Sequence, residues 1–228
     1  MKKPTGDSGP IKVSINPDRQ PGAIFDKIEF PKIKSDIEQY IVSKFIHSAD
    51  KELSKSGDKF FISNPILNSE NDFDFNVTTP RGLAFLELME AAPLELIKGN
   101  YSNAKASYKP YDMANNIIEK ITKKSNKYPN NLKSELFLLI YGTHWSFYFD
   151  ELTYMYLRYF LSKMKTSFNA IFTYFPLDIN EGVVKWLFPV PPDFIENFDP
   201  DLYTHNIVCN LDPNKWIFIW KNTGQNFT

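Results

Sequence analysis

The stretch that decides the fold is DFDFNVTTPRGLAFLELM, which runs from Asp72 to Met89. Its first half alternates acidic and apolar residues, as does a β-strand with one polar and one apolar face. A turn-forming Thr-Thr-Pro-Arg-Gly sequence separates this half from a second, strongly apolar strand. The two halves therefore predict an antiparallel hairpin with Asp74 on one strand and Glu87 on the other.

The loop length decides which acidic side chains share a face of this hairpin. Side chains alternate between the two faces of a strand, so a shift of one residue exchanges the faces. A five-residue loop would place Glu90 on the face of the aspartates, whereas a four-residue loop or a bulge would place Glu87 there. Asp72 and Glu90 are therefore additional or replacement candidates beside the pair Asp74 and Glu87.

Helical and strand patterns surround the hairpin in the order helix, three strands, helix, strand. Apolar residues recur at helical spacing over 33–53, and a short strand is expected at 60–66. After the hairpin, a second helix is expected from Pro110, followed by an apolar strand at 136–141. Further elements are predicted as a helix from Asp150 and strands at 170–175, 183–188 and 216–220. These patterns indicate an α/β domain with a mixed central sheet flanked by helices, and with an additional C-terminal helix and strands.

The composition suits one domain of ordinary size. The chain has 228 residues, of which 43% are hydrophobic, and this is enough to build one substantial core. Residues 1–25 are polar and proline-rich, so we expect a flexible N-terminal arm, with the domain over 26–228. No apolar run has the length of a membrane helix or a secretion signal, which favours no membrane partner and a cytoplasmic location.

Charge and cysteine content narrow the classes of function. The 26 basic and 27 acidic residues nearly cancel, so any nucleic-acid site must be local. Cys209 is the single cysteine, which excludes an internal disulfide and a multi-cysteine zinc site. Carboxylates are the protein ligands that Mg²⁺ prefers, so Asp74 and Glu87 are candidate ligands of Mg²⁺ or Mn²⁺.

This arrangement resembles the PD-(D/E)XK nuclease-like (restriction-endonuclease-like) superfamily over 33–141. The core of that superfamily runs helix, three strands, helix, strand, with Asp on the second strand and Glu-X-Lys on the third. The resemblance matches Asp74 to that aspartate and Glu87-Leu88-Met89 to the Glu-X-Lys motif. It implies that Asp74, Glu87 and the carbonyl of Leu88 bind the metal, and that Glu38 on the first helix is an auxiliary acid.

The chain departs from the superfamily pattern at Met89, which stands at the lysine position. A thioether can neither orient a water molecule nor stabilise negative charge. Some members of the superfamily supply this cation from the second helix. The resemblance therefore nominates Lys120, or Lys109 at the helix entrance, as the displaced catalytic lysine.

Basic residues gather around the second predicted helix. The segment from Tyr101 to Lys133 contains seven lysines and only two acids, Asp112 and Glu119. The segment 171–213 instead contains seven acids and one lysine. A DNA backbone could therefore follow lysines at helical spacing on one side of this helix. This candidate DNA-binding stripe consists of Lys120, Lys123, Lys124 and Lys127.

The sequence supports two functions of different classes. The first is a metal-dependent nuclease-like protein that hydrolyses DNA phosphodiester bonds, as an Mg²⁺-dependent endodeoxyribonuclease. The second is a catalytically inactive module with the same fold that binds a protein or nucleic-acid partner, or forms a homodimer. The acidic pair favours the first interpretation, and the missing lysine at Met89 favours the second.

Overall fold

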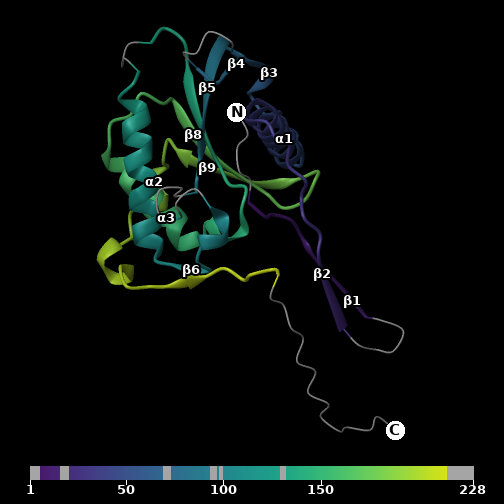
Figure 1. Cartoon of the computed structure of the whole chain (residues 1–228). Coiled ribbons are helices and arrows are strands. Elements are labelled where there is room, and N and C mark those ends of the chain that lie inside the picture. Colours follow the sequence, from purple (N-terminus) through teal and green to yellow (C-terminus); the bar gives the residue numbers. More distant parts are fainter. Residues whose placement is uncertain are drawn as a thin grey trace.

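A six-stranded mixed sheet forms the centre of the structure, with strand order β3-β4-β5-β7-β8-β9 (Figure 1). The structure is a computed structural model that describes residues 6–15, 21–68, 73–92, 97, 100–128 and 132–214. Strands β5, β7 and β8 are parallel, and the remaining neighbours pair in the antiparallel direction. The strands of this sheet are β3 (Ser63–Leu67), β4 (Phe75–Thr79), β5 (Gly82–Glu90), β7 (Leu136–Tyr141), β8 (Ala170–Pro176) and β9 (Gly182–Phe188).

Three α-helices in the described part of the chain cover the two faces of the sheet (Figure 1). Helix α1 (Lys34–Ser54) buries Ile37, Ile41 and Phe45 at every fourth position against one face. Helices α2 (Pro110–Ser125) and α3 (Glu151–Lys163) pack on the other face. Both cores are built from the sheet, and the fully buried strand β7 contributes to each. The predicted α/β class with a mixed sheet between helices is therefore confirmed.

Smaller elements complete the described structure. An antiparallel pair of short strands, β6 (Ser107–Tyr108) and β10 (Val208–Cys209), joins the region before α2 to the C-terminal part of the chain. The 3-10 helices are η1 (Tyr101–Asn103), η2 (Trp145–Phe147), η3 (Pro192–Phe194) and η4 (Pro200–Tyr203). The strand predicted at 216–220 lies outside the described residues. No helix in the described part of the chain is both long and apolar enough to cross a membrane.

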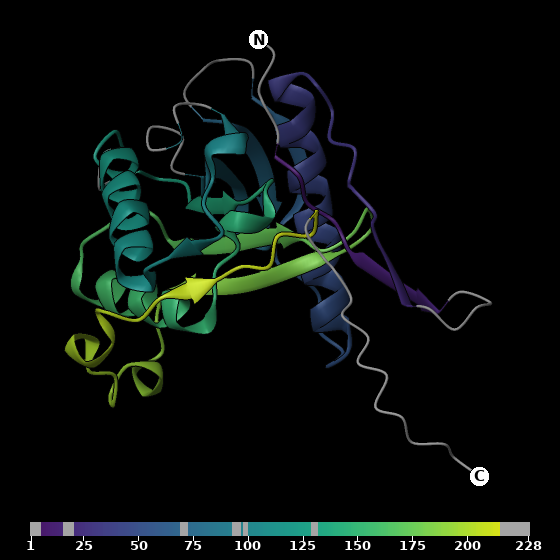
Figure 2. The ribbon, with the colours of Figure 1, turned by 60° about the horizontal axis from the view of Figure 1, so that its bottom comes forward.

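The N-terminal arm, which the sequence predicts to be flexible, contains two short strands in its described residues. Strands β1 (Ile11–Ile15) and β2 (Pro21–Phe25) pair as an antiparallel ribbon that extends from the body in both views (Figures 1 and 2). Before the ribbon, Ser8 is fully buried and accepts a hydrogen bond of 2.9 Å from the Tyr148 hydroxyl. The base of the arm therefore packs on the domain, and a chain beginning near Asp26 would lose these contacts.

The hairpin turn is shorter than the four or five residues considered from the sequence. Thr79 pairs with Gly82, so only two residues lie between the strands. The φ angle of Gly82 is +114°, a conformation that glycine adopts without the clash of a Cβ atom. The register ends with Phe75 opposite Leu86, so Asp74, the residue before β4, comes next to Glu87 on the neighbouring strand. A loop with an even number of residues therefore places Glu87, rather than Glu90, on the same face as Asp74.

Candidate metal centre

An acidic and basic cleft lies where the β4–β5 hairpin meets the end of α2. We call it the carboxylate cleft; its volume is about 360 Å³. Strand β5 contributes Glu87, the residue before β4 is Asp74, and α1 contributes Glu38. The other residues that line the cleft are Lys34, Leu67, Asn68, Phe73, Lys124, Lys127 and Tyr128. The three acids that the sequence matched to the superfamily are therefore brought to one cavity.

Lys124 joins the two central carboxylates. Its Nζ atom lies 3.7 Å from Asp74 Oδ2 and forms a shorter ion pair with Glu87 Oε2. The Glu87 side chain is only 4% exposed, whereas 26% of Asp74 is exposed. Both carboxylates thus lie within reach of one cationic centre, which is the geometry that a shared cation requires.

The surroundings of Glu87 disfavour its charged form. Burial and, to a smaller extent, the negative charge of Asp74 raise the pKa of Glu87 above its usual value. The ammonium group of Lys124 and the hydrogen bond with Tyr128 oppose this rise without cancelling it. Glu87 is therefore a carboxylate whose ionisation depends on a neighbouring positive charge.

Aromatic stacking holds the wall of the cleft in place. The ring of Phe73 stacks on Phe85 at 4.0 Å between centroids and on Tyr128 at 5.2 Å. Phe73 immediately precedes Asp74, and Phe85 is two residues before Glu87 on the same face of β5. These contacts fix the chain on both sides of the acidic pair.

The backbone of Leu88 faces the acidic pair. On the side of β5 that faces β7, the N–H of Phe85 donates to the carbonyl of Glu135, and the N–H of Ala91 donates to the carbonyl of Tyr141. Because backbone groups alternate along a strand, those of Leu88 face the β4 side. Accordingly, the N–H of Leu88 donates to Asp74 Oδ2 at 2.7 Å. By the same alternation, the Leu88 carbonyl points toward the β4 side. It lies beyond Phe75 and Leu86, the last pair of residues in the register of β4 with β5.

Glu38 reaches the cleft from the opposite layer of the fold. It is buried on α1, and its Oε1 lies 3.4 Å from Lys34 Nζ one turn earlier. The charge of Glu38 contributes to raising the pKa of Tyr141 on β7, after burial and Glu90. Glu38 therefore lines the carboxylate cleft and forms an ion pair with Lys34.

The two replacement ligands considered from the sequence are not part of the described cleft. Glu90 accepts hydrogen bonds from the hydroxyls of Tyr101 at 2.6 Å and Thr143 at 2.7 Å. It has the opposite strand parity to Glu87, so it belongs to a separate network. Asp72 lies outside the described residues. Asp74 and Glu87 remain the candidate ligand pair.

The cation in the cleft is Lys124 and not either of the two nominated lysines. Lys109 lines a different pocket at the start of α2. Lys120 Nζ donates to the carbonyl of Ala92 at 2.9 Å. Met89 packs in the core beneath α2, together with Ala114 and Ile117. Lys124 lies one helical turn beyond Lys120, a shift of about 6 Å that the helical spacing alone does not resolve.

The four lysines of the predicted DNA-binding stripe have different environments in the structure. Lys124 is directed to the acidic pair, and Lys120 is bonded to the backbone. Lys123 and Lys127 are exposed, and Lys127 also lines the carboxylate cleft. Among the described residues, the exposed lysines that line the cleft are Lys34 and Lys127. Sequence reasoning missed Lys34; its spacing of four residues from Glu38 was the available signal.

Within the described part of the chain, the metal-binding potential of the cleft rests on the two carboxylates of Asp74 and Glu87. Among the described residues, no group of three or more His, Cys, Asp or Glu side chains is arranged to hold a metal ion. Mg²⁺ requires fewer, because it commonly binds one or two carboxylates and keeps several waters. The donor chemistry of Asp74 and Glu87 therefore fits Mg²⁺ or Mn²⁺, provided that Lys124 moves away from the pair.

Comparison with known proteins returned no match. No protein-family model, no curated protein and no solved structure matches the chain. The arguments for function therefore rest on the geometry of the site.

Proposed function

We propose that the protein is a metal-dependent nuclease-like hydrolase of DNA phosphodiester bonds, built on a restriction-endonuclease-like core. The observation that carries this proposal is that Asp74 and Glu87 line one cleft, with Lys124 Nζ in contact with both carboxylates. The arrangement of α1, β3, β4, β5, α2 and β7 supports it, because the element order and the two acids agree with that core.

In this proposal, Asp74 and Glu87 hold Mg²⁺ or Mn²⁺, and the Leu88 carbonyl is an additional ligand. The metal would lower the pKa of a bound water and neutralise charge on the phosphate. Glu38 lies at the edge of the cleft, where it accepts a hydrogen bond from a water molecule. Lys34 and Lys127 attract the DNA backbone by charge.

Lys124 has two roles in this proposal. It compensates the charge of the acidic pair in this structure, and it would be available to a scissile phosphate if Asp74 and Glu87 held a metal ion instead. An ammonium group at that point stabilises the negative charge that develops in the transition state. Lys124 thus supplies the cation that Met89 cannot.

Cleavage and metal-binding assays test the proposal together. We expect cleavage of single-stranded or duplex DNA with Mg²⁺ or Mn²⁺, and loss of at least about 100-fold in rate in Asp74→Asn and in Glu87→Gln. Glu119→Gln is the matched control, because Glu119 is an exposed acid on α2 outside the cleft. Unchanged cleavage in both cleft variants would contradict the proposal.

The contact of Lys124 with both carboxylates also favours a second candidate function. If Lys124 holds the pair permanently, the ion pair is a structural replacement for the metal, and the domain is an inactive module that binds a partner. Calorimetry with Mg²⁺ and Mn²⁺ distinguishes the two candidates. Lys124→Gln should bind metal more tightly than the wild type if lysine and metal compete. Absence of metal binding in both proteins favours the inactive module.

A further inference from the structure

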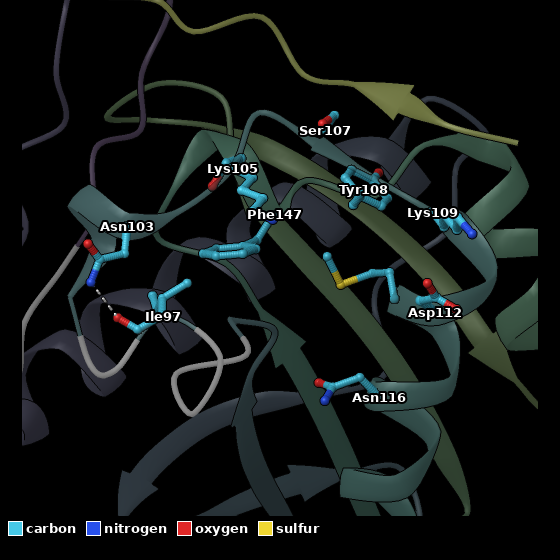
Figure 3. A pocket seen from close by; sticks show the side chains of 11 residues that line it. Ile97, Asn103, Lys105, Ser107, Tyr108, Lys109, Asp112, Asn116 and Phe147 are labelled. Atoms are coloured by element: carbon cyan, nitrogen blue, oxygen red, sulfur yellow. Dashed lines mark hydrogen bonds between the residues drawn. The ribbon is translucent and has the colours of Figure 1, made fainter.

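A second pocket lies at the opposite end of α2 from the carboxylate cleft. Its volume is about 390 Å³, and it shares no lining residue with the cleft. The first turns of α2 form one side, and the segment from η1 to β6 forms another (Figure 3). Compact sites for small ligands begin at about 300 Å³. The pocket is therefore large enough to hold a small organic molecule and does not belong to the proposed metal centre.

The floor of this pocket, which we call the α2-entrance pocket, is apolar. Met113 and Phe147 are 7% and 4% exposed, and they pack in one cluster with Ile97. In Figure 3, Phe147 and Ile97 face Asn116 and Asp112 across the pocket. An apolar floor of this kind suits the flat face of a ring.

A buried acceptor on α2 lies in this apolar setting. The Oδ1 atom of Asn116 is buried and has no hydrogen-bond partner among the described residues. A buried polar atom without a partner is costly, and native proteins satisfy such atoms in most cases. The oxygen is closed to solvent, so the Asn116 side chain, which lines the pocket, would have to turn for a ligand N–H or O–H group to donate to it.

Two cations border the same pocket. Lys105 and Lys109 both line it and are exposed, and neither forms an ion pair within the described ranges. Asp112 is the one acid among the described residues that line it. The excess of positive charge at the rim favours a ligand that carries an anionic group outside the apolar floor.

From these three features we infer that the α2-entrance pocket binds an adenine nucleotide. The base lies on the floor formed by Met113 and Phe147, and its amino group donates to Asn116 Oδ1. An asparagine amide pairs with adenine through both its acceptor and its donor. The phosphate lies at the rim, beside Lys105 and Lys109. This binding site is separate from the proposed phosphodiester cleavage and does not depend on it.

Calorimetric titration with AMP tests the inference on the full chain. We expect AMP to bind, with UMP, adenosine and inorganic phosphate each at least about tenfold weaker, because each lacks one of the recognised groups. Asn116→Leu and the double variant Lys105→Gln/Lys109→Gln should each weaken AMP binding at least about tenfold. Lys123→Gln is the matched control, since Lys123 is an exposed lysine of α2 outside the pocket, and it should leave affinity unchanged.

Two further measurements keep this result separate from the fate of the metal centre. Glu87→Gln should bind AMP as the wild type does, whatever its effect on cleavage. Thermal unfolding of Asn116→Leu should show a folded protein, so that lost binding is not lost structure. The inference is overturned if AMP does not bind at millimolar concentration, if Asn116→Leu binds AMP normally, or if Glu87→Gln abolishes binding.

Discussion

The two ends of α2 hold positive charge in different ways. At the C-terminal end, Lys124 is largely buried and forms ion pairs with Asp74 and Glu87. At the N-terminal end, about 22 Å away along the axis, Lys105 and Lys109 are exposed beside an apolar floor and a buried amide oxygen. The lysine at one end is therefore part of the folded structure, whereas those at the other end are available to a ligand.

The lysines at the two ends of α2 are therefore expected to contribute differently to the free energy of unfolding. Removal of one partner from a buried ion pair leaves the other charge without compensation, which is costly. Exposed lysines without a partner contribute little. The comparison therefore predicts large effects on folding at the carboxylate cleft and small ones at the α2-entrance pocket.

The largest effect is expected for Lys124→Met. The variant leaves two adjacent carboxylates with no ammonium group, and we expect the free energy of unfolding at pH 7 to fall by about 2–4 kcal/mol. Urea denaturation measures this change, and Lys123→Met is the matched control on the exposed side of the helix. Addition of Mg²⁺ should restore part of the loss if the pair binds the metal. Equal stability of the two variants would show that Lys124 is not needed to balance the pair.

An intermediate effect is expected from the titration of Glu87. Its pKa is raised in the folded state, so the folded protein binds this proton more tightly than the unfolded chain does. The contribution of Glu87 to stability is therefore most favourable below its usual pKa of about 4.3 and declines as the pH rises through the raised value. Denaturation of wild type and Glu87→Gln across this range should show the decline in the wild type alone.

The same titration sets the pH dependence of the metal centre. Because a metal ligand must be deprotonated, Mg²⁺ affinity should increase as the pH rises through the raised pKa of Glu87. Glu119→Gln should follow the wild-type profile, since Glu119 lies outside the cleft. A flat profile of metal affinity over this range would show that Glu87 is not a ligand.

The smallest effect is expected at the other end of the helix. Asn116→Leu removes a buried oxygen that has no partner among the described residues, so we expect stability to change by less than about 0.5 kcal/mol or to increase slightly. Thermal unfolding measures this change. A loss of several kcal/mol would show that Asn116 contributes to the fold and would remove the contrast between the two ends.

The sequence predicted most of the helices and strands of the sheet and its two faces, because each of them depends on a hydrophobic pattern over a few neighbouring residues. The spacing of Ile37, Ile41 and Phe45 is sufficient to predict α1, and the apolar run of β7 is sufficient to predict a central strand. The arm was harder, because the contact of Ser8 with Tyr148 joins residues 140 positions apart. No local pattern signals such a contact.

The amino-acid sequence by itself determined the α/β class and the hairpin, with Asp74 beside one strand and Glu87 on the other, because periodicity and turn residues act over a few positions. Only the tertiary structure decided that the turn has two residues, that Asp74 and Glu87 line one cleft, and that Lys124 contacts them while Lys120 donates to the backbone. It also placed Lys105, Asn116 and Phe147, which come from three separate segments, around one pocket. These outcomes depend on how α2 docks on the sheet, and that position is set by packing over the whole core.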